Sequence, residues 1–107
     1  MLTNEEKIKI LSFGGYRISD YGEKFEEEIL IKCFYPNGAF GYGLPDLNDL
    51  NILMEIIQNK CAVWEIISND IIRVNICGIG QKETISAKSK NLVEAIQNAL
   101  LQLAEQN

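Results

Sequence analysis

Two apolar runs separated by a short polar segment constrain the fold of this chain more than any other feature. Cys61 to Ile67 and Ile71 to Cys77 are rich in β-branched residues, and Ser68-Asn69-Asp70 joins them with turn-forming side chains. This pattern predicts a β-hairpin and therefore an antiparallel sheet. After a second turn at 78–83, Thr84 to Lys88 is predicted to be a third strand.

Helical periodicity lies on both sides of this hairpin. Residues 3–12 are predicted to form a helix whose start is stabilised by a capping box between Thr3 and Glu6. Apolar residues at helical spacing predict a second helix from Asp46 to about residue 60 and a third from Asn91 to Glu105.

The segment between the first two helices is predicted to be mostly extended. Tyr16 to Asp20 alternates as a short strand does, and Tyr21 to Lys24 has the composition of a turn. Phe25 to Tyr35 is a predicted strand closed by the turn Pro36-Asn37-Gly38. Ala39 to Pro45 is then a loop rich in aromatic residues and glycine.

The resulting order, α-β-β-α-β-β-β-α, predicts an α+β fold in which an antiparallel sheet of about four to five strands packs against helices. The chain has 107 residues, enough for one hydrophobic core and too few for two, so we expect residues 1–107 to form a single domain. A sheet with few strands leaves edges to cover, so we also expect a homo-oligomer.

Composition disfavours several chemistries. The chain has no histidine, the commonest general base and metal ligand. Its three cysteines, Cys33, Cys61 and Cys77, form no CxxC pair, so we expect buried free thiols, with no metal site and no cofactor. With 10 basic and 15 acidic residues, the formal net charge of −5 disfavours direct nucleic-acid binding.

The distribution of apolar residues gives an expectation about location. No apolar segment approaches the roughly 20 residues that a membrane-spanning helix needs. The first residues are polar and acidic, unlike a signal peptide. We therefore expect no membrane association and a place in the cytoplasm.

The loop rich in aromatic residues and glycine is the strongest candidate binding site. Phe40 and Tyr42, with Tyr35 before the turn, are separated by glycines that permit close backbone approach. Aromatic rings stack on planar ligands such as nucleobases. The structural alternative is a turn that covers the sheet edge with its rings packed inward.

Charged residues supply two further candidates. Arg17 and Arg73 are the two arginines of the chain, and a guanidinium binds phosphate or carboxylate through two hydrogen bonds. For Arg73 the alternatives are a solvated sheet residue or a pair with Glu65 on the neighbouring strand. The acidic run Glu26-Glu27-Glu28 would suit a basic protein surface, or it is a solvated face that favours solubility.

Three segments of the second half carry a family resemblance. Leu44-Pro45-Asp46-Leu47-Asn48-Asp49-Leu50 leads into an amphipathic helix, and a strand bearing Trp64 opens the hairpin. A strand of small residues, Ile85 to Ser89, then runs into a terminal helix that begins Leu92-Val93-Glu94-Ala95. From Gly43 to Glu105 the chain resembles the phage ABA sandwich domain family. The resemblance implies an α+β sandwich of phage or prophage origin, and the family supplies no catalytic residues to carry over.

We therefore expect a non-enzymatic phage accessory protein that counters host defence by sequestering a nucleotide signal or a host defence component. One alternative is an anti-CRISPR-like protein whose acidic run blocks a nucleic-acid-binding host enzyme. Others are a structural phage protein and a small metal-dependent nucleotide hydrolase, the latter disfavoured by the lack of histidine. The residues expected to bind a ligand are Arg17, Tyr35, Phe40, Tyr42 and Arg73.

Overall fold

The chain folds into two small sheets with helices between them. The computed structural model describes residues 2–25 and 28–106, with the backbone alone for 20–25 and 28–30. The helices are α1 (Asn4–Phe13), α2 (Leu50–Lys60) and α3 (Leu92–Glu105). The strands are β1 (Arg17–Phe25), β2 (Glu28–Phe34), β3 (Phe40–Tyr42), β4 (Cys61–Ser68), β5 (Ile72–Gly78) and β6 (Ile85–Ser89).

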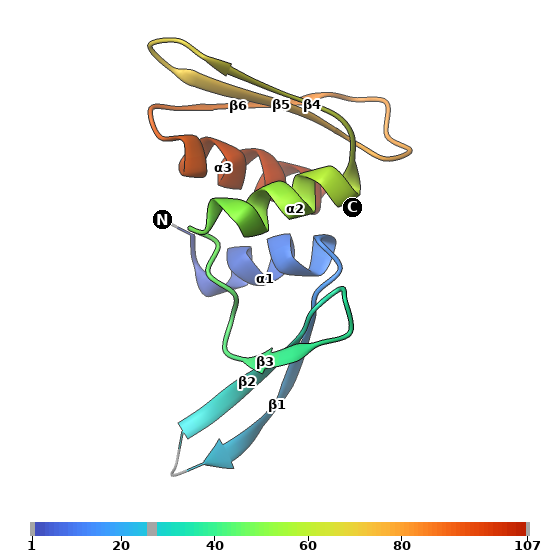
Figure 1. The fold of residues 1–107 in the computed structure, drawn as a ribbon, viewed down its shortest axis with the longest axis vertical. Helices are drawn as coiled ribbons and strands as arrows, with labels where there is room; N and C mark the ends of the chain where they lie inside the picture. Colours follow the sequence, from blue (N-terminus) through green and yellow to red (C-terminus); the bar gives the residue numbers. More distant parts are fainter. Residues whose placement is uncertain (1, 26–27, 107) are drawn as a thin grey trace.

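The α+β class is confirmed, but the predicted single sheet is wrong. The strands in the described residues form two antiparallel sheets of three, β1-β2-β3 and β4-β5-β6, which we name the arm sheet and the body sheet. Figure 1 shows them at opposite ends of the molecule with the helices between. The result is an elongated shape, 48 × 29 × 21 Å.

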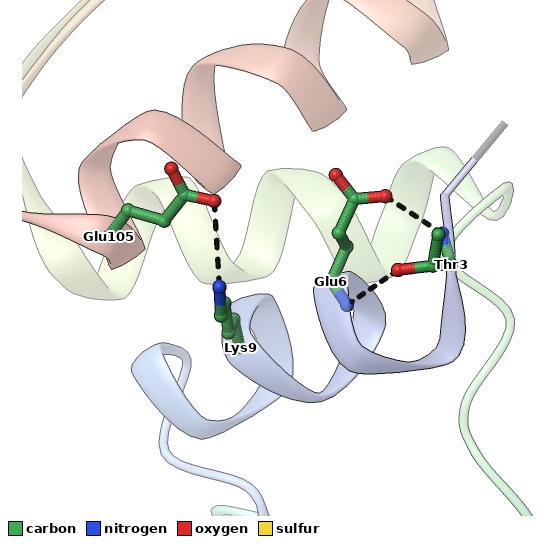
Figure 2. Close-up of polar contacts among 4 residues, drawn as sticks. All are labelled: Thr3, Glu6, Lys9 and Glu105. Atoms are coloured by element: carbon green, nitrogen blue, oxygen red, sulfur yellow. Dashed lines mark hydrogen bonds and ion pairs between the residues drawn. The ribbon is translucent and has the colours of Figure 1, made fainter.

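Helix α1 begins as its capping box predicts. The Thr3 hydroxyl oxygen accepts a hydrogen bond from the Glu6 backbone N–H at 3.2 Å, and the Glu6 carboxylate accepts one from the Thr3 N–H at 2.9 Å. Figure 2 shows both bonds, together with an ion pair of 3.7 Å between Lys9 and Glu105. This pair links α1 to the end of α3.

The arm sheet differs most from the prediction. Tyr21 to Lys24, predicted as a turn, belongs to β1, whose pairing with β2 shifts in register between Ser19 and Glu23. Phe40 to Tyr42, predicted as loop, forms the short strand β3. In both places, pairing with β2 overrides the local turn preference, because strand formation depends on the neighbouring strand more than on composition.

Helix α2 begins four residues later than predicted. The Asp46 side chain accepts a hydrogen bond from the Asn48 N–H at 2.9 Å, which makes 46–48 a turn. Asp49 is the N-cap instead, and its side chain accepts from the Asn51 N–H. Two acidic residues three apart therefore stabilise two successive turns rather than one helix start.

The body sheet and α3 agree with the sequence. The hairpin β4–β5 and the strand β6 lie where predicted, and α3 starts after its N-cap Asn91. Helix α3 packs across β5 and β6, and α1 and α2 pack against α3. Hydrophobic burial drives this assembly. Among the side chains that the structure describes, the buried core formed here includes none from the arm strands, although Ile18 of β1 packs against it.

Two of the three cysteine predictions are confirmed. All three thiols are free; Cys33 and Cys61 are buried, whereas Cys77 is half-buried. Cys77 lies on the face of β5 that α3 does not cover, because it alternates with the buried Ile76 and Gly78. None of the helices within 2–25 and 28–106 is long and apolar enough to cross a lipid bilayer.

Candidate functional site

One exposed face of the arm sheet collects cations and aromatic rings. Arg17, Phe34 and Phe40 lie directly opposite one another on β1, β2 and β3, and Lys32 lies opposite Tyr42. Residues opposite one another, or two apart along a strand, share a face of an antiparallel sheet. We call this set, Arg17, Lys32, Phe34, Phe40 and Tyr42, the cation–aromatic face.

The two cations lie over the rings. The Arg17 Cζ atom is 4.5 Å from the centre of the Phe34 ring, and the Lys32 Nζ atom is 4.3 Å from the centre of the Phe40 ring. Phe40 also packs at 6.0 Å from Phe34 and at 6.3 Å, edge on, from Tyr42. Each cation–π contact at an exposed site is worth only about 0.5–1 kcal/mol, so a phosphate would readily attract these cations.

The rings on this face point toward solvent. Phe40 is 54% exposed and Tyr42 is 51% exposed, whereas Cys33, on the opposite face of β2, is fully buried. The inward-packed alternative for these two rings is therefore wrong. The apolar residues of this face are available to a ligand without any rearrangement of the core.

A tight turn brings β3 back beside β2. The Asn37 side chain accepts from the Ala39 N–H at 2.9 Å, and the Tyr35 N–H donates to the Ala39 carbonyl at 2.8 Å. Gly38 adopts a φ of 91°, which favours glycine. The predicted Pro-Asn-Gly turn is thus what presents Phe40 and Tyr42.

Tyr35 belongs to the other face of the arm sheet. Its ring packs edge on against Tyr16 at 5.7 Å. Its hydroxyl lies over Gly41, where a Cβ atom would be 2.6 Å from the hydroxyl oxygen. The Tyr35 side chain therefore occupies the space that the missing Gly41 side chain leaves open. The structure separates Tyr35 from Phe40 and Tyr42, because it alternates with Phe34 along the chain.

Arg73 also lies apart from the cation–aromatic face. It is exposed on β5 of the body sheet, opposite Ile67 and Lys88, at the other end of the molecule (Figure 1). Its predicted partner Glu65 lies opposite Asn75 instead, and the Asn75 amide donates to the Glu65 carboxylate at 3.1 Å. Arg17 and Arg73 therefore do not act on one ligand within one chain.

The acidic run lies mostly beyond the structural description. Glu26 and Glu27 fall outside the described residues, and Glu28 is placed by its backbone alone, as the first residue of β2 opposite Phe25. The blocking role of these glutamates stays a prediction.

Lys32 and Phe34 belong to the cation–aromatic face, although the sequence did not single them out as candidates. Within the predicted strand they alternate with Cys33 and Tyr35. That alternation was the available signal, because it puts Lys32 and Phe34 on one face and a buried thiol on the other.

Because no known protein resembles this chain in the comparisons, its function has to be inferred from its own residues. No family model, curated protein or solved structure matches this chain. In the part of the chain that the structure describes, no three cysteine or acidic residues gather closely enough to hold a metal ion.

Proposed function

We propose that this chain is a non-enzymatic binding protein whose cation–aromatic face holds a nucleotide. The observation that supports this most is the placement of Arg17 and Lys32 among three aromatic rings on one exposed sheet face. A nucleotide has a flat base and a phosphate, and this face offers rings for the first and cations for the second.

The parts of the face have different roles in the proposal. Phe40 and Tyr42 stack on the base, because they are the most exposed rings of the cation–aromatic face. Arg17 and Lys32 contact the phosphate. Among the side chains that the structure places, neither cation has a carboxylate partner within ion-pair distance.

Charge restricts the size of the ligand. A long nucleic acid presents many phosphates to the whole protein surface, and the net charge of −5 repels it. A mononucleotide or a cyclic dinucleotide presents its charge only to the local cations. We therefore propose that the ligand is a small nucleotide signal and that the protein acts by sequestering it.

The biological setting comes from the resemblance to the phage ABA sandwich domain family. On this basis we propose a phage or prophage protein in the host cytoplasm that counters host defence by sequestering the nucleotide signal. A host defence protein is the alternative partner in this setting.

The test is binding to a panel of nucleotide second messengers, with native mass spectrometry for stoichiometry and titration calorimetry for affinity. We expect one bound nucleotide for each cation–aromatic face. Phe40→Ala and Tyr42→Ala should each weaken binding about tenfold or more, since stacking on one base is worth roughly 1–3 kcal/mol. Their melting temperatures should stay close to that of the parent.

The two arginines provide a matched control. Arg17→Ala should weaken nucleotide binding, whereas Arg73→Ala, an exposed arginine of the other sheet, should leave it unchanged. Equal losses in both variants, or a panel with no adduct, would reject the nucleotide proposal and favour capture of a host protein.

A further inference from the structure

A cleft lies on the opposite side of the arm sheet from the cation–aromatic face. It has a volume of about 390 Å³. Its walls come from the residue before β1, the turn after β2, the segment before α2, and α2 itself. The residues that matter for its chemistry are Tyr16, Tyr35, Pro45, Asp46, Ile52 and Glu55. This volume is within the range of small-molecule sites.

The cleft exists because the arm sheet is joined to the body without a helix of its own to cover it. Helix α2, which follows β3 in sequence, packs against α3 and the start of β4. Its outer side, with Ile52 and Glu55, therefore faces Tyr16 and Tyr35 across the cleft. Both tyrosines and Ile52 are half-buried, so an apolar body is partly shielded from water there.

The cleft has the opposite charge to the cation–aromatic face. Asp46 and Glu55 supply two carboxylates, and no residue that lines the cleft is basic. The Asp46 side chain already accepts from the Asn48 N–H, but in the described side chains Glu55 has no hydrogen bond or ion pair. Glu55 is therefore available to a bound cation.

The pKa shift of Tyr16 also indicates that the charge of Glu55 acts inside the cleft. Burial raises the pKa of Tyr16, and the negative charge of Glu55 raises that pKa further. The Glu55 carboxylate is therefore close enough to Tyr16 for its charge to act on the tyrosine hydroxyl. A cation bound between them would be attracted by both the ring and the carboxylate.

We propose that this cleft binds an organic ammonium ion, with the Tyr16 and Tyr35 rings around its alkyl groups and Glu55 and Asp46 balancing its charge. The two ring centres are 5.7 Å apart and the ring planes meet at 74°, so the rings form two adjacent sides of a small aromatic cage. Asp46 and Glu55 line the same cleft. The ammonium group comes either from a free amine or from a lysine side chain. This site does not depend on the nucleotide proposal, because it shares no residue with the cation–aromatic face.

The experiment is an NMR titration of the intact chain with n-butyltrimethylammonium and with n-butylammonium, at constant ionic strength. n-Butanol is the neutral control for the alkyl chain. We expect saturable shifts at Tyr16, Tyr35 and Glu55 with a Kd on the order of 1 mM. n-Butanol should bind at least about fivefold more weakly, because it lacks the charge.

Variants distinguish specific binding in the cleft from general attraction of cations to an acidic protein. Glu55→Gln keeps the shape and removes the charge, and it should weaken binding of both ammonium probes about fivefold or more. Tyr35→Leu should do the same by removing a ring face. Glu83→Gln, in the exposed turn before β6, is the control and should bind as the parent does.

The outcomes decide the proposal clearly. Equal binding of n-butanol and n-butylammonium, equal affinity of Glu55→Gln and the parent, or no saturable shift would each overturn it. N-acetyl-lysine methylamide identifies the source: binding admits a lysine side chain, and no binding restricts the site to free amines. Arg17→Ala should leave ammonium binding unchanged, so failure here and failure of nucleotide binding are distinguishable.

Discussion

At the scale of single residues, burial sets the chemistry of the thiols. Cys33 and Cys61 are buried, and Cys61 belongs to the hydrophobic core. A buried thiolate is poorly solvated. Burial raises the pKa of both thiols, and for Cys61, with Cys77 nearby, the pKa rises to about 11. Both therefore stay protonated at neutral pH and are poor nucleophiles there.

This shift predicts a loss of stability in alkali. From the ordinary thiol pKa of 9.0 up to about 11, the unfolded chain loses a proton that folded Cys61 retains, so rising pH favours unfolding. Between pH values of about 8 and 10.5, Cys61 should cost about 2 kcal/mol of unfolding free energy. Urea denaturation should show a smaller loss over this range in Cys61→Ala than in the parent. Parallel pH profiles would contradict the assignment.

At the scale of elements, strand β4 is an exposed edge of the body sheet. It lies at one side of the body sheet and pairs with β5 in the described residues. Val63 is 65% exposed, Trp64 is 42% exposed and Ile67 is 37% exposed. Glu65 is the only charged residue of the strand. A long apolar edge with one charge is a template for pairing with another strand.

We therefore predict that a second copy of the chain pairs through β4 to form a dimer. Val63→Glu places a second negative charge beside Glu65 and should produce a monomer in light scattering coupled to size exclusion. Ile79→Glu is the matched control, because Ile79 is also 65% exposed but lies in the turn after β5. A parent protein that is monomeric at micromolar concentration would exclude this dimer.

At the scale of the whole molecule, the chain after α1 consists of two successive units of three strands and a helix. In the second unit α3 covers its own sheet, whereas in the first unit α2 packs on α3 and β4. The arm sheet is consequently attached at the rim of the core, through half-buried Tyr16 and Ile18. This placement leaves one arm face open and forms the cleft on the other.

The arm should open more easily than the body. Amides of Lys32, Cys33 and Phe34 are expected to exchange with solvent about tenfold or more faster than those of Val74, Asn75 and Ile76, because local opening of the arm exposes less apolar surface. Hydrogen exchange followed by NMR measures both sets in one experiment. Equal protection would mean that arm and body unfold as one unit.

The sequence by itself determined the elements whose signals are local. The capping box of Thr3 and Glu6, the hairpin β4–β5 and the apolar stripe of α3 depend on residues within a few turns of one another. The same holds for the Pro36-Asn37-Gly38 turn, which lies where its composition predicts it. Local hydrogen bonds and burial periods are encoded at this range, so they could be predicted.

Only the tertiary structure decided which of these elements meet. It separated Arg73 and Tyr35 from the exposed rings, added Lys32 and Phe34 to them, and divided the predicted sheet into two. It also packed α2 against α3 and β4 rather than over the arm sheet, and this packing leaves the cleft lined by Tyr16 and Glu55. The physical reason is that the partner and the buried face of an element are chosen by apolar surface elsewhere in the chain, which no local pattern specifies.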